Sequence, residues 1–360
     1  MNHRLIYLFF LLLVTSVCVR DSRAQTRQKE VDAELWQKAL DLHKRAFVFD
    51  AHAHKLVFGK EDQAKYYPSA PQLDMEKMKA GGVDGVGLFF AYHPIKNQTL
   101  YAKVDSDLKT LHKRVEKNNA SIEMVKQAND ISLATQNGHQ LIVPGVEYFF
   151  GALNGSVSTI DSLYSLGIRV VTLMDNKRDR LSYSIGDDPS NRQLNILGQR
   201  VIERMNELGM LIDISHLDDM MQVNVIEHSD LPVIASHSPV RGVHHTPRNI
   251  PDHILKKLAQ KEGSIMITFN SGDLAGIEEG RCRIDHLIDH IDHAVKVAGI
   301  DHVGIGSDFN GAGRRSPQGL EDASGFPFIT YHMLKRGYTE DQIKKILGEN
   351  YRKLLSEVMN

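Results

Sequence analysis

Two histidines one residue apart, His52 and His54, close an apolar run in the segment AFVFDAHAHK. Residues i and i+2 of a β-strand point to the same face of a sheet, so both imidazoles can face one point. Converging imidazoles are typical ligands of a bound metal ion. Because histidines also occur in such pairs by chance, the pair indicates a metal site only if other candidate ligands are predicted nearby.

Four other apolar runs also end in a residue that can bind a metal ion or transfer a proton. These residues are Glu147 in LIVPGVE, His216 in LIDISH, His237 in VIASH and Asp308 in HVGIGSD. A β/α barrel builds its active site from residues at the carboxyl ends of its strands. The repeated placement of a histidine or a carboxylate at a strand tip therefore predicts one shared site.

The residue types indicate metal-assisted hydrolysis. Imidazole and carboxylate groups suit zinc and similar divalent cations. Four histidines and one glutamate exceed the needs of one four-coordinate ion, so we predict two divalent ions, with zinc as the expected metal. In the simplest partition Glu147 is shared, with His52 and His54 on one ion and His216 and His237 on the other. A metal-bridging hydroxide would be the nucleophile, and Asp308 would carry its proton to the leaving group.

Eight β-rich runs alternating with helical patterns would position these residues. Strands are predicted at 46–51, 84–90, 141–147, 169–174, 210–215, 232–236, 264–269 and 302–307. Helices are predicted at 73–80, 106–136 with a break near Asn129, 157–166, 195–208, 218–228, 251–260 and 283–298. This alternation predicts parallel strands joined by right-handed crossovers, and eight such units close a (β/α)8 TIM barrel of the metal-dependent hydrolase type.

Helical extensions flank the predicted barrel. An amphipathic helix is expected near 31–45, and the tail 327–360 should be helical and pack outside the barrel. Glycines at 81–82, 167, 209, 263 and 299 fall between a helix and the next strand, where a left-handed cap is favoured.

The first 24 residues have the composition of a secretory signal peptide. Arg4 precedes the apolar stretch 5–14, and small residues lead to a cleavage site after Ala24. We therefore expect a single domain over 25–360, exported across the inner membrane and periplasmic. No stable membrane span should remain after processing. An uncleaved anchor, or a lipoprotein modified at Cys18, stays open as an alternative.

Composition excludes several classes of protein. The chain carries a formal net charge of −2 and has no basic stripe, so it is not expected to bind nucleic acid. Loss of the first 24 residues would leave one cysteine, Cys282, which cannot form an internal disulfide. The fold must then depend on its apolar core, and the expected partner is a small-molecule substrate.

Some polar residues near the predicted site have simpler interpretations. His286, His290 and His293 share one face of the helix 283–298, which leads into the last strand, so we interpret them as structural. Asp50 and Asp213 precede His52 and His216 closely. Each could orient a ligand imidazole, as carboxylates commonly do, or could be an ordinary polar strand residue.

The chain resembles the membrane dipeptidase family, also called renal dipeptidase or dehydropeptidase. The resemblance runs from about Phe47 to Leu355 and is carried by KAGGVDGVGLF, LGQRVIERMNELGMLIDISH, PVIASHSPVRGVHHTPRNIPD, DHIDHAVKVAGIDHVGIGSDFNG and GLEDAS. These binuclear zinc peptidases belong to the amidohydrolase superfamily. The resemblance implies a β/α barrel, two zinc ions, cleavage of dipeptides and a possible homodimer.

The resemblance also implies residue roles. Four residues match family metal ligands: His52, Glu147, His216 and His237. Asp308 matches the catalytic acid/base. Arg248 in PRNIP matches a substrate-binding arginine, and its guanidinium suits the terminal carboxylate of a dipeptide.

Three positions depart from the family pattern. His54 stands where the family has a carboxylate, which leaves one negative charge fewer at the site. Asp175 replaces a substrate-facing histidine, and it could hold a substrate ammonium or be neutralised by a nearby cation. The residues at 148–150, Tyr-Phe-Phe, replace Gly-Gly-His and should reshape the pocket.

These departures leave the substrate open. The leading prediction is an exported, metal-dependent dipeptidase. One alternative is another amidohydrolase reaction at the same site, acting on an N-acyl amino acid, a lactam or a lactone. The other is a catalytically degenerate barrel that binds without turnover.

Overall fold

The computed structural model describes residues 32–59, 71–91, 100–118, 120–147, 156–173, 182–184, 192–277, 281–311 and 315–359. The predicted signal peptide, Asp175 and residues 148–150 lie outside these ranges. No helix in the described part of the chain is long and apolar enough to cross a membrane.

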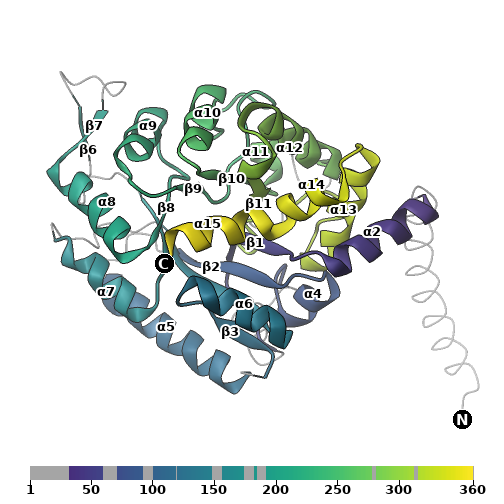
Figure 1. Cartoon of the computed structure of the whole chain (residues 1–360), viewed down its shortest axis with the longest axis horizontal. Coiled ribbons are helices and arrows are strands. Elements are labelled where there is room, and N and C mark those ends of the chain that lie inside the picture. The colour runs from purple at the N-terminus through teal and green to yellow at the C-terminus, as the bar shows by residue number, and fades with distance from the viewer. Residues whose placement is uncertain are drawn as a thin grey trace, which may run out of the picture.

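Eight strands form the predicted barrel wall, in the order in which they occur along the chain (Figure 1). They are β1 (Phe49–His54), β2 (Gly85–Ala91), β4 (Gln140–Glu147), β5 (Val170–Thr172), β8 (Leu211–Asp213), β9 (Ile234–Ala235), β10 (Ser264–Ile267) and β11 (Val303–Ile305). Every neighbouring pair along this path is parallel. The architecture is a (β/α)8 TIM barrel, as the alternating pattern predicted.

The first and last strands meet through a short seam that closes the barrel. Ala53 forms a parallel bridge with Phe309, and the Asp308 backbone N–H donates to the His52 carbonyl oxygen at 2.8 Å. Nearby, the buried Asp50 carboxylate accepts both the N–H and the hydroxyl of Ser307, at 2.8 and 2.5 Å. One carboxylate thus links β1 to the segment that follows β11, which is distant in the sequence.

Most outer helices begin and end close to the predicted residues. They are α4 (Met75–Ala80), α5 (Leu100–Lys117), α6 (Ala128–Asn137), α7 (Ser158–Leu166), α8 (Ile196–Leu208), α9 (Asp219–His228), α10 (Asp252–Gln260) and α12 (Ile284–Ala298). A short helix, α11 (Ser271–Ala275), follows β10. Polar side chains start several of them, since Asn195 and Asp218 accept backbone N–H groups of the first turns of α8 and α9.

The prediction of one interrupted helix over 106–136 was wrong. The helix α5 begins earlier, at Leu100, and a third segment separates it from α6. That segment is the strand β3 (Ile122–Met124), which pairs in parallel with β4. A second pair, β6 (Ser182–Ser184) and β7 (Arg192–Leu194), is antiparallel and lies off the barrel.

The glycine pattern holds at most of the predicted helix ends. Gly82, Gly167, Gly209 and Gly299 have positive φ. At the end of α10 the positive φ falls instead on Glu262, at 56°. Gly263 is needed there for close packing, because an added Cβ would lie 2.5 Å from the Val233 carbonyl oxygen.

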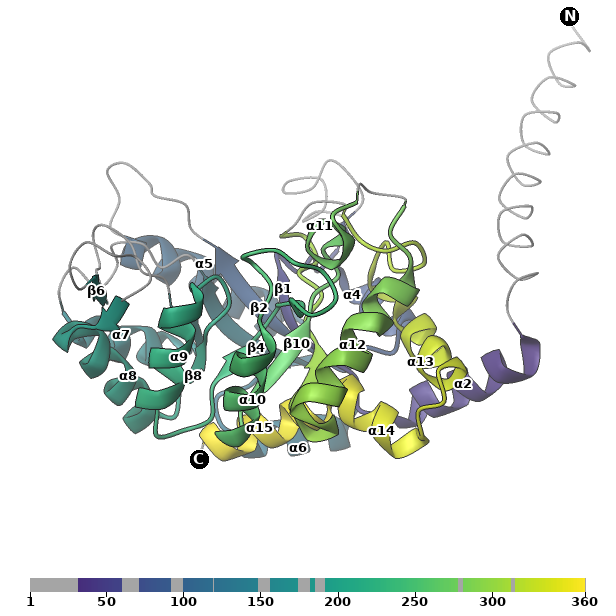
Figure 2. The same cartoon turned by 90° about the horizontal axis from the view of Figure 1, so that it is seen from above.

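The C-terminal part of the chain is helical, and one of its helices closes the amino-terminal end of the barrel. These helices are α13 (Phe326–Lys335), α14 (Glu340–Lys344), a π-helical segment η5 (Lys345–Glu349) and α15 (Asn350–Val358). Tyr351 of α15 packs against Phe49 at the start of β1, with ring centroids 4.8 Å apart. Figure 2 shows α15 at one end of the barrel and α11 at the other. The tail is helical as predicted, and α15 covers the amino ends of the strands.

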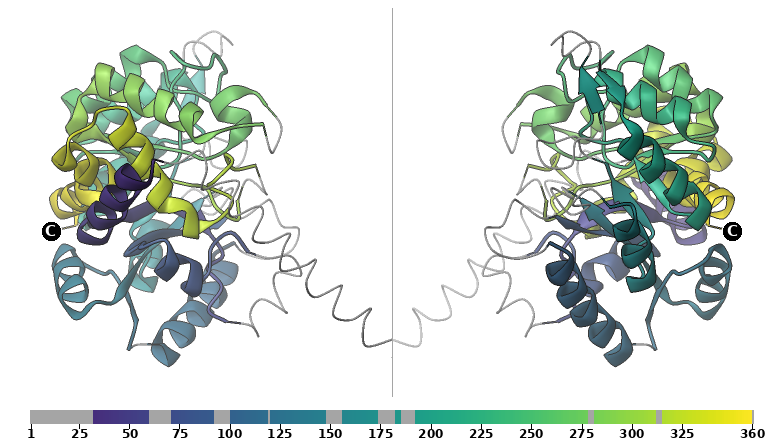
Figure 3. Two further views of the ribbon diagram at one scale, coloured as in Figure 1. Left: turned by 90° about the vertical axis from the view of Figure 1, so that its right-hand side faces the viewer. Right: turned by 90° about the vertical axis from the view of Figure 1, so that its left-hand side faces the viewer.

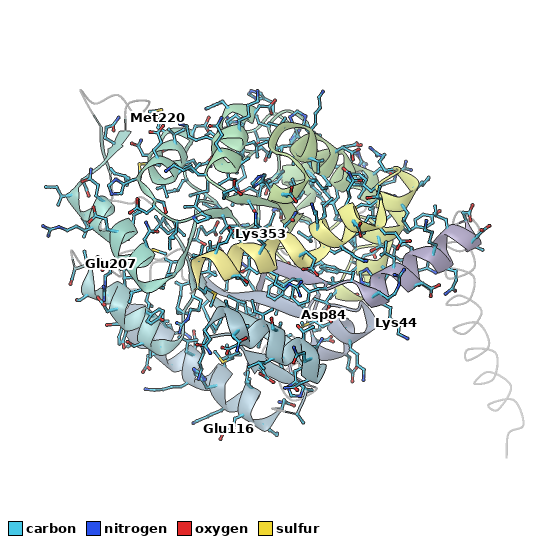
Figure 4. All side chains as sticks on the ribbon, in the orientation of Figure 1. Lys44, Asp84, Glu116, Glu207, Met220 and Lys353 are labelled. Atoms are coloured by element: carbon cyan, nitrogen blue, oxygen red, sulfur yellow. The ribbon has the colours of Figure 1, made fainter. Side chains whose placement is uncertain are left out.

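The N-terminal helix α2 (Ala33–Arg45) packs against α13, beside the C-terminal helices (Figure 3). Its buried His43 contacts the Thr330 hydroxyl and the Gly81 carbonyl oxygen, each at 2.7 Å. Burial lowers the pKa of His43 to about 4. Lys44 of the same helix and Glu116 and Glu207 on other helices are exposed on the outer ring (Figure 4).

The histidine-bearing face of α12 is structural, as expected. The buried His290 accepts the Val240 N–H at Nδ1 and donates to the Leu274 carbonyl oxygen at Nε2, at 3.0 and 2.8 Å. His293 contacts the Asp252 carboxylate at 2.7 Å. Both rings join α12 to neighbouring segments rather than to the predicted site.

Candidate metal centre

The predicted ligands gather at the carboxyl ends of the strands. Glu147 is the last residue of β4, while His216 and His237 lie three and two residues beyond β8 and β9. His52 and His54 lie within β1 rather than after it, because pairing with β2 continues to the His54–Phe89 register. Four of the eight strands therefore supply the histidines and the glutamate.

One half of the cluster surrounds the Oε2 atom of Glu147. The Nε2 atoms of His54 and His52 lie 3.3 and 3.8 Å from this oxygen and 3.2 Å from one another. Ligand atoms about 2.1 Å from a tetrahedral zinc ion would be separated by roughly 3.4 Å. The observed separations therefore suit two imidazoles and a carboxylate oxygen around one small cation.

The other half surrounds the Oε1 atom of the same carboxylate. His216 Nε2 and His237 Nε2 lie 2.8 and 3.2 Å from it and 2.8 Å from one another. Glu147 thus presents a different oxygen to each histidine pair. The histidines are thus paired around Glu147 as in the predicted partition, while the binding of two ions there stays a prediction.

Contacts of the imidazole rings on the side away from Glu147 explain how these rings are oriented. His54 Nδ1 contacts the Phe89 carbonyl oxygen at 3.0 Å, and a carbonyl can only accept, so this nitrogen carries a proton. The ring of His52 is stacked on Phe89, with centroids 3.8 Å apart, and lies 3.7 Å from the ring of His237. Packing and hydrogen bonding together direct the Nε2 atoms at Glu147.

This arrangement fits divalent cations. The Oε1 atom of Glu147 is buried and accepts no hydrogen bond of good geometry from the described residues, although imidazole nitrogens converge on it. Buried lone pairs that face one another without a proton or cation between them are unfavourable. Two sets of three ligand atoms each lie within 4.8 Å of one another, namely His52 with His54 and Asp308, and His52 with Glu147 and His237. Nitrogen and oxygen donors of this kind match the preference of zinc.

Burial and contacts between the charged groups shift the pKa values of the residues in the cluster. Burial would raise the pKa of Glu147, but the adjacent His237 and His216 hold it well below its usual range. Burial lowers the pKa of His52 well below its usual value. Burial also acts to lower the pKa of His54, but its contacts with Asp308 and Glu147 outweigh that effect and raise it to about 10. The carboxylates of Glu147 and Asp308 thus favour a positive charge at His54 Nε2, which either a proton or a bound cation can supply.

Asp308 lies at the more open edge of the cluster. Its Oδ1 atom is 3.3 Å from His54 Nε2, and 14% of its side chain is exposed. Its φ of 60° is unusual for a residue other than glycine. Gly311 leaves room for it, since an added Cβ would lie 2.0 Å from Asp308 Oδ1. The loop after β11 therefore holds this carboxylate beside the histidines, with solvent access.

Arg248 lies beside the second histidine pair. Its Nη2 donates to the His237 carbonyl oxygen at 2.6 Å, and its Nη1 donates to the Ser238 hydroxyl at 2.9 Å. Burial lowers the pKa of His216, and the positive charge of Arg248 lowers it further. Because a guanidinium has five N–H donors, the two hydrogen bonds of Arg248 leave capacity for a carboxylate.

Sequence reasoning missed Ser236, Ser307 and Phe89 as parts of the site. The two serines form hydrogen bonds beside the ligands, and Phe89 supports both His52 and His54. The serines directly precede His237 and Asp308, which was the available signal. Their partners come from other strands, so only the folded arrangement reveals their contacts.

Comparison with known proteins identifies the family of this chain. A family model described as membrane dipeptidase, peptidase family M19, matches residues 36–360. The dipeptidase tcpJ of Claviceps purpurea (strain 20.1) is 33% identical over 238 residues, which are 66% of this chain and 55% of that protein. The chain therefore spans little more than half the length of that relative.

Two further proteins extend the comparison. The uncharacterized dipeptidase C965.12 of Schizosaccharomyces pombe (strain 972 / ATCC 24843) is 32% identical over 293 residues, which are 77% of this chain and 70% of that protein. A metallopeptidase from Rhodobacter sphaeroides, solved with a phosphinate mimic of the dipeptide L-Ala-D-Ala, has a TM-score of 0.74. It is 23% identical, and the match covers 87% of this chain and 99% of that one, which shows a common fold. Since the family model covers nearly all of the described chain, this protein belongs to the membrane dipeptidase family of metallopeptidases, peptidase family M19.

Proposed function

We propose that this protein is an exported dipeptidase that uses two divalent metal ions, with zinc as the expected metal. The observation that carries the proposal is the convergence of four imidazoles on the two oxygens of Glu147. We assign His52, His54, Glu147, His216 and His237 as the metal ligands. Cations held there would lower the pKa of water towards neutrality and polarise the scissile carbonyl.

The remaining site residues have separate roles in the proposed reaction. Water attacks the carbonyl carbon of the peptide bond, and Asp308 accepts a proton from that water. Asp308 then donates the proton to the departing nitrogen as the C–N bond breaks. Its exposed edge and its position 3.3 Å from His54 suit a group that must meet both water and substrate.

Arg248 is proposed to bind the terminal carboxylate of the substrate. The guanidinium is held beside His237 by two hydrogen bonds, so its orientation is fixed before substrate arrives. A carboxylate bound there would place a dipeptide across the cluster. The dipeptide mimic bound by the Rhodobacter sphaeroides protein supports this substrate class.

Export is proposed from the leading segment alone. Arg4, the apolar stretch 5–14 and the small residues up to Ala24 have the order of a cleavable signal peptide. Such a protein would meet its substrates in the periplasm.

A substrate panel tests the proposed activity. We expect zinc-loaded protein to hydrolyse free dipeptides, and to cleave the same dipeptides with an amidated C-terminus roughly 10–100-fold less efficiently in kcat/KM, because a charge-assisted hydrogen bond is lost. Arg248→Ala should lower kcat/KM for the free dipeptide and leave the amide nearly unaffected. N-acyl amino acids, lactams and lactones complete the panel.

Each result of the panel decides between the alternatives. Turnover of an N-acyl amino acid or a cyclic substrate without turnover of any dipeptide would replace the proposed substrate class. Bound metal with no hydrolysis of any panel member would favour a binding barrel. Equal cleavage of free and amidated dipeptides would remove the role assigned to Arg248.

A further inference from the structure

We propose that Ser236 is a positioning residue shared by the two halves of the metal centre, because its one hydroxyl fixes the proton positions of both His52 and His237. This inference rests on the proposed metal site. It concerns how the chain aims its ligands and does not depend on which substrate is cleaved.

Ser236 lies at the meeting point of three buried side chains. Its Oγ is 2.8 Å from His52 Nδ1, 2.9 Å from His237 Nδ1 and 2.6 Å from Asp213 Oδ2. Ser236 and Asp213 are completely buried, so water cannot replace any of these contacts at low cost. The two imidazoles belong to opposite halves of the cluster around Glu147.

Counting protons gives one arrangement that satisfies all three contacts. A serine hydroxyl has one hydrogen to donate and two lone pairs that accept. The Asp213 carboxylate can only accept, so the hydroxyl hydrogen must point to it. The two lone pairs then accept from Nδ1–H of His52 and Nδ1–H of His237. With a proton on each Nδ1, the Nε2 atom of each neutral ring keeps the lone pair that a metal requires.

Asp213 is itself held in place as an acceptor. Its Oδ1 accepts the backbone N–H groups of Ser215 and Ser236, at 3.0 and 2.9 Å. Its Oδ2 accepts the hydroxyls of Thr172 and Ser236, both at 2.6 Å. The carboxylate thus joins β5, β8 and the segment after β9. Of the two interpretations left open by the sequence, orientation of ligand imidazoles is the one that this geometry supports, with Ser236 as the intermediary.

Removal of the Ser236 hydroxyl should weaken the binding of both metal ions. For Ser236→Ala we expect each affinity to fall roughly 10–100-fold, the usual effect of losing a group that orients ligands. Thr172→Val is the matched control, since it removes the other hydroxyl donor to Asp213 Oδ2 and leaves both contacts of Ser236 with the imidazoles in place. Zinc affinities would be measured by competition with a chelator of known affinity, with no substrate present.

Asp213→Asn provides a second variant that leaves Ser236 in place. The two backbone donors should keep the amide oxygen at the Oδ1 position, which places the NH2 group beside Ser236 Oγ. The amide would then donate to Ser236, and the hydroxyl hydrogen would turn towards an imidazole. We expect this variant to reproduce the affinity loss of Ser236→Ala.

Nitrogen NMR of the histidine side chains in the zinc-loaded protein gives an independent readout. Wild type and Thr172→Val should show protonated Nδ1 atoms on His52 and His237, with the protons protected from exchange, and Ser236→Ala should lose that protection. Wild-type affinities in folded Ser236→Ala, or loss of only one equivalent, would overturn the shared role. Absence of metal binding in the wild type would instead overturn the proposed metal centre.

Discussion

Glu147→Gln should abolish tight binding of both metal equivalents and, with it, hydrolysis. The substitution keeps the shape of the side chain but removes the charge that faces four imidazoles within 3.8 Å. Loss of an orienting group alone costs roughly 10–100-fold in metal affinity, so loss of a shared ligand should exceed that for both equivalents. Elemental analysis and chelator competition would measure the effect.

Thermal unfolding supplies a check that does not depend on turnover. Zinc at about 100 times its Kd should stabilise the wild type by about 2.7 kcal/mol for each ion bound, and this gain should vanish in Glu147→Gln. Glu227→Gln is the control, because Glu227 is exposed on the outer helix α9, where it forms an ion pair with Lys257. If Glu147→Gln bound two equivalents with wild-type affinity, the carboxylate would not be the shared ligand.

The second large effect is expected for Asp308→Asn, in turnover rather than in metal content. Removing the proton carrier should lower kcat by about 10²–10⁴-fold. The defect should shrink for substrates whose leaving nitrogen is weakly basic, since such a group needs less protonation. Steady-state kinetics on a dipeptide and on an aminoacyl anilide would compare the two.

The position of Asp308 makes metal content a necessary control. Its carboxylate lies within reach of a cation held by His52 and His54. Retention of two equivalents alongside the kinetic defect would support proton transfer as its role, and loss of one equivalent would show that it acts as a ligand instead. Asp301→Asn, which alters an exposed ion pair with Lys345, should change neither quantity.

The barrel could be predicted because each strand is a short apolar run bounded by clear signals. Glu147 falls at the last residue of its strand, as its pattern indicated. The boundary of β1 was less visible, because its extension to His54 depends on pairing with Phe89 in another strand. The strand β3 has only three residues, too few to establish a period, so the surrounding helical pattern concealed it.

The candidate metal ligands could be predicted from the sequence, whereas the residues that orient their side chains could not. Histidine and glutamate are recognised as ligands by residue type, but serine and threonine are common in every kind of segment. Ser236 becomes significant only when β8 and β9 lie side by side and bring Asp213 to its hydroxyl. Likewise, the bond between Asp50 and Ser307 depends on closure of the barrel between its first and last strands.

The most direct test of a two-metal dipeptidase is a titration of zinc into metal-free protein while dipeptide hydrolysis is followed. The proposed centre predicts that activity is absent after chelation and returns as two equivalents bind, with Glu147→Gln remaining inactive throughout. Hydrolysis that persists in the metal-free protein, or two bound equivalents that restore no dipeptide cleavage, would contradict it.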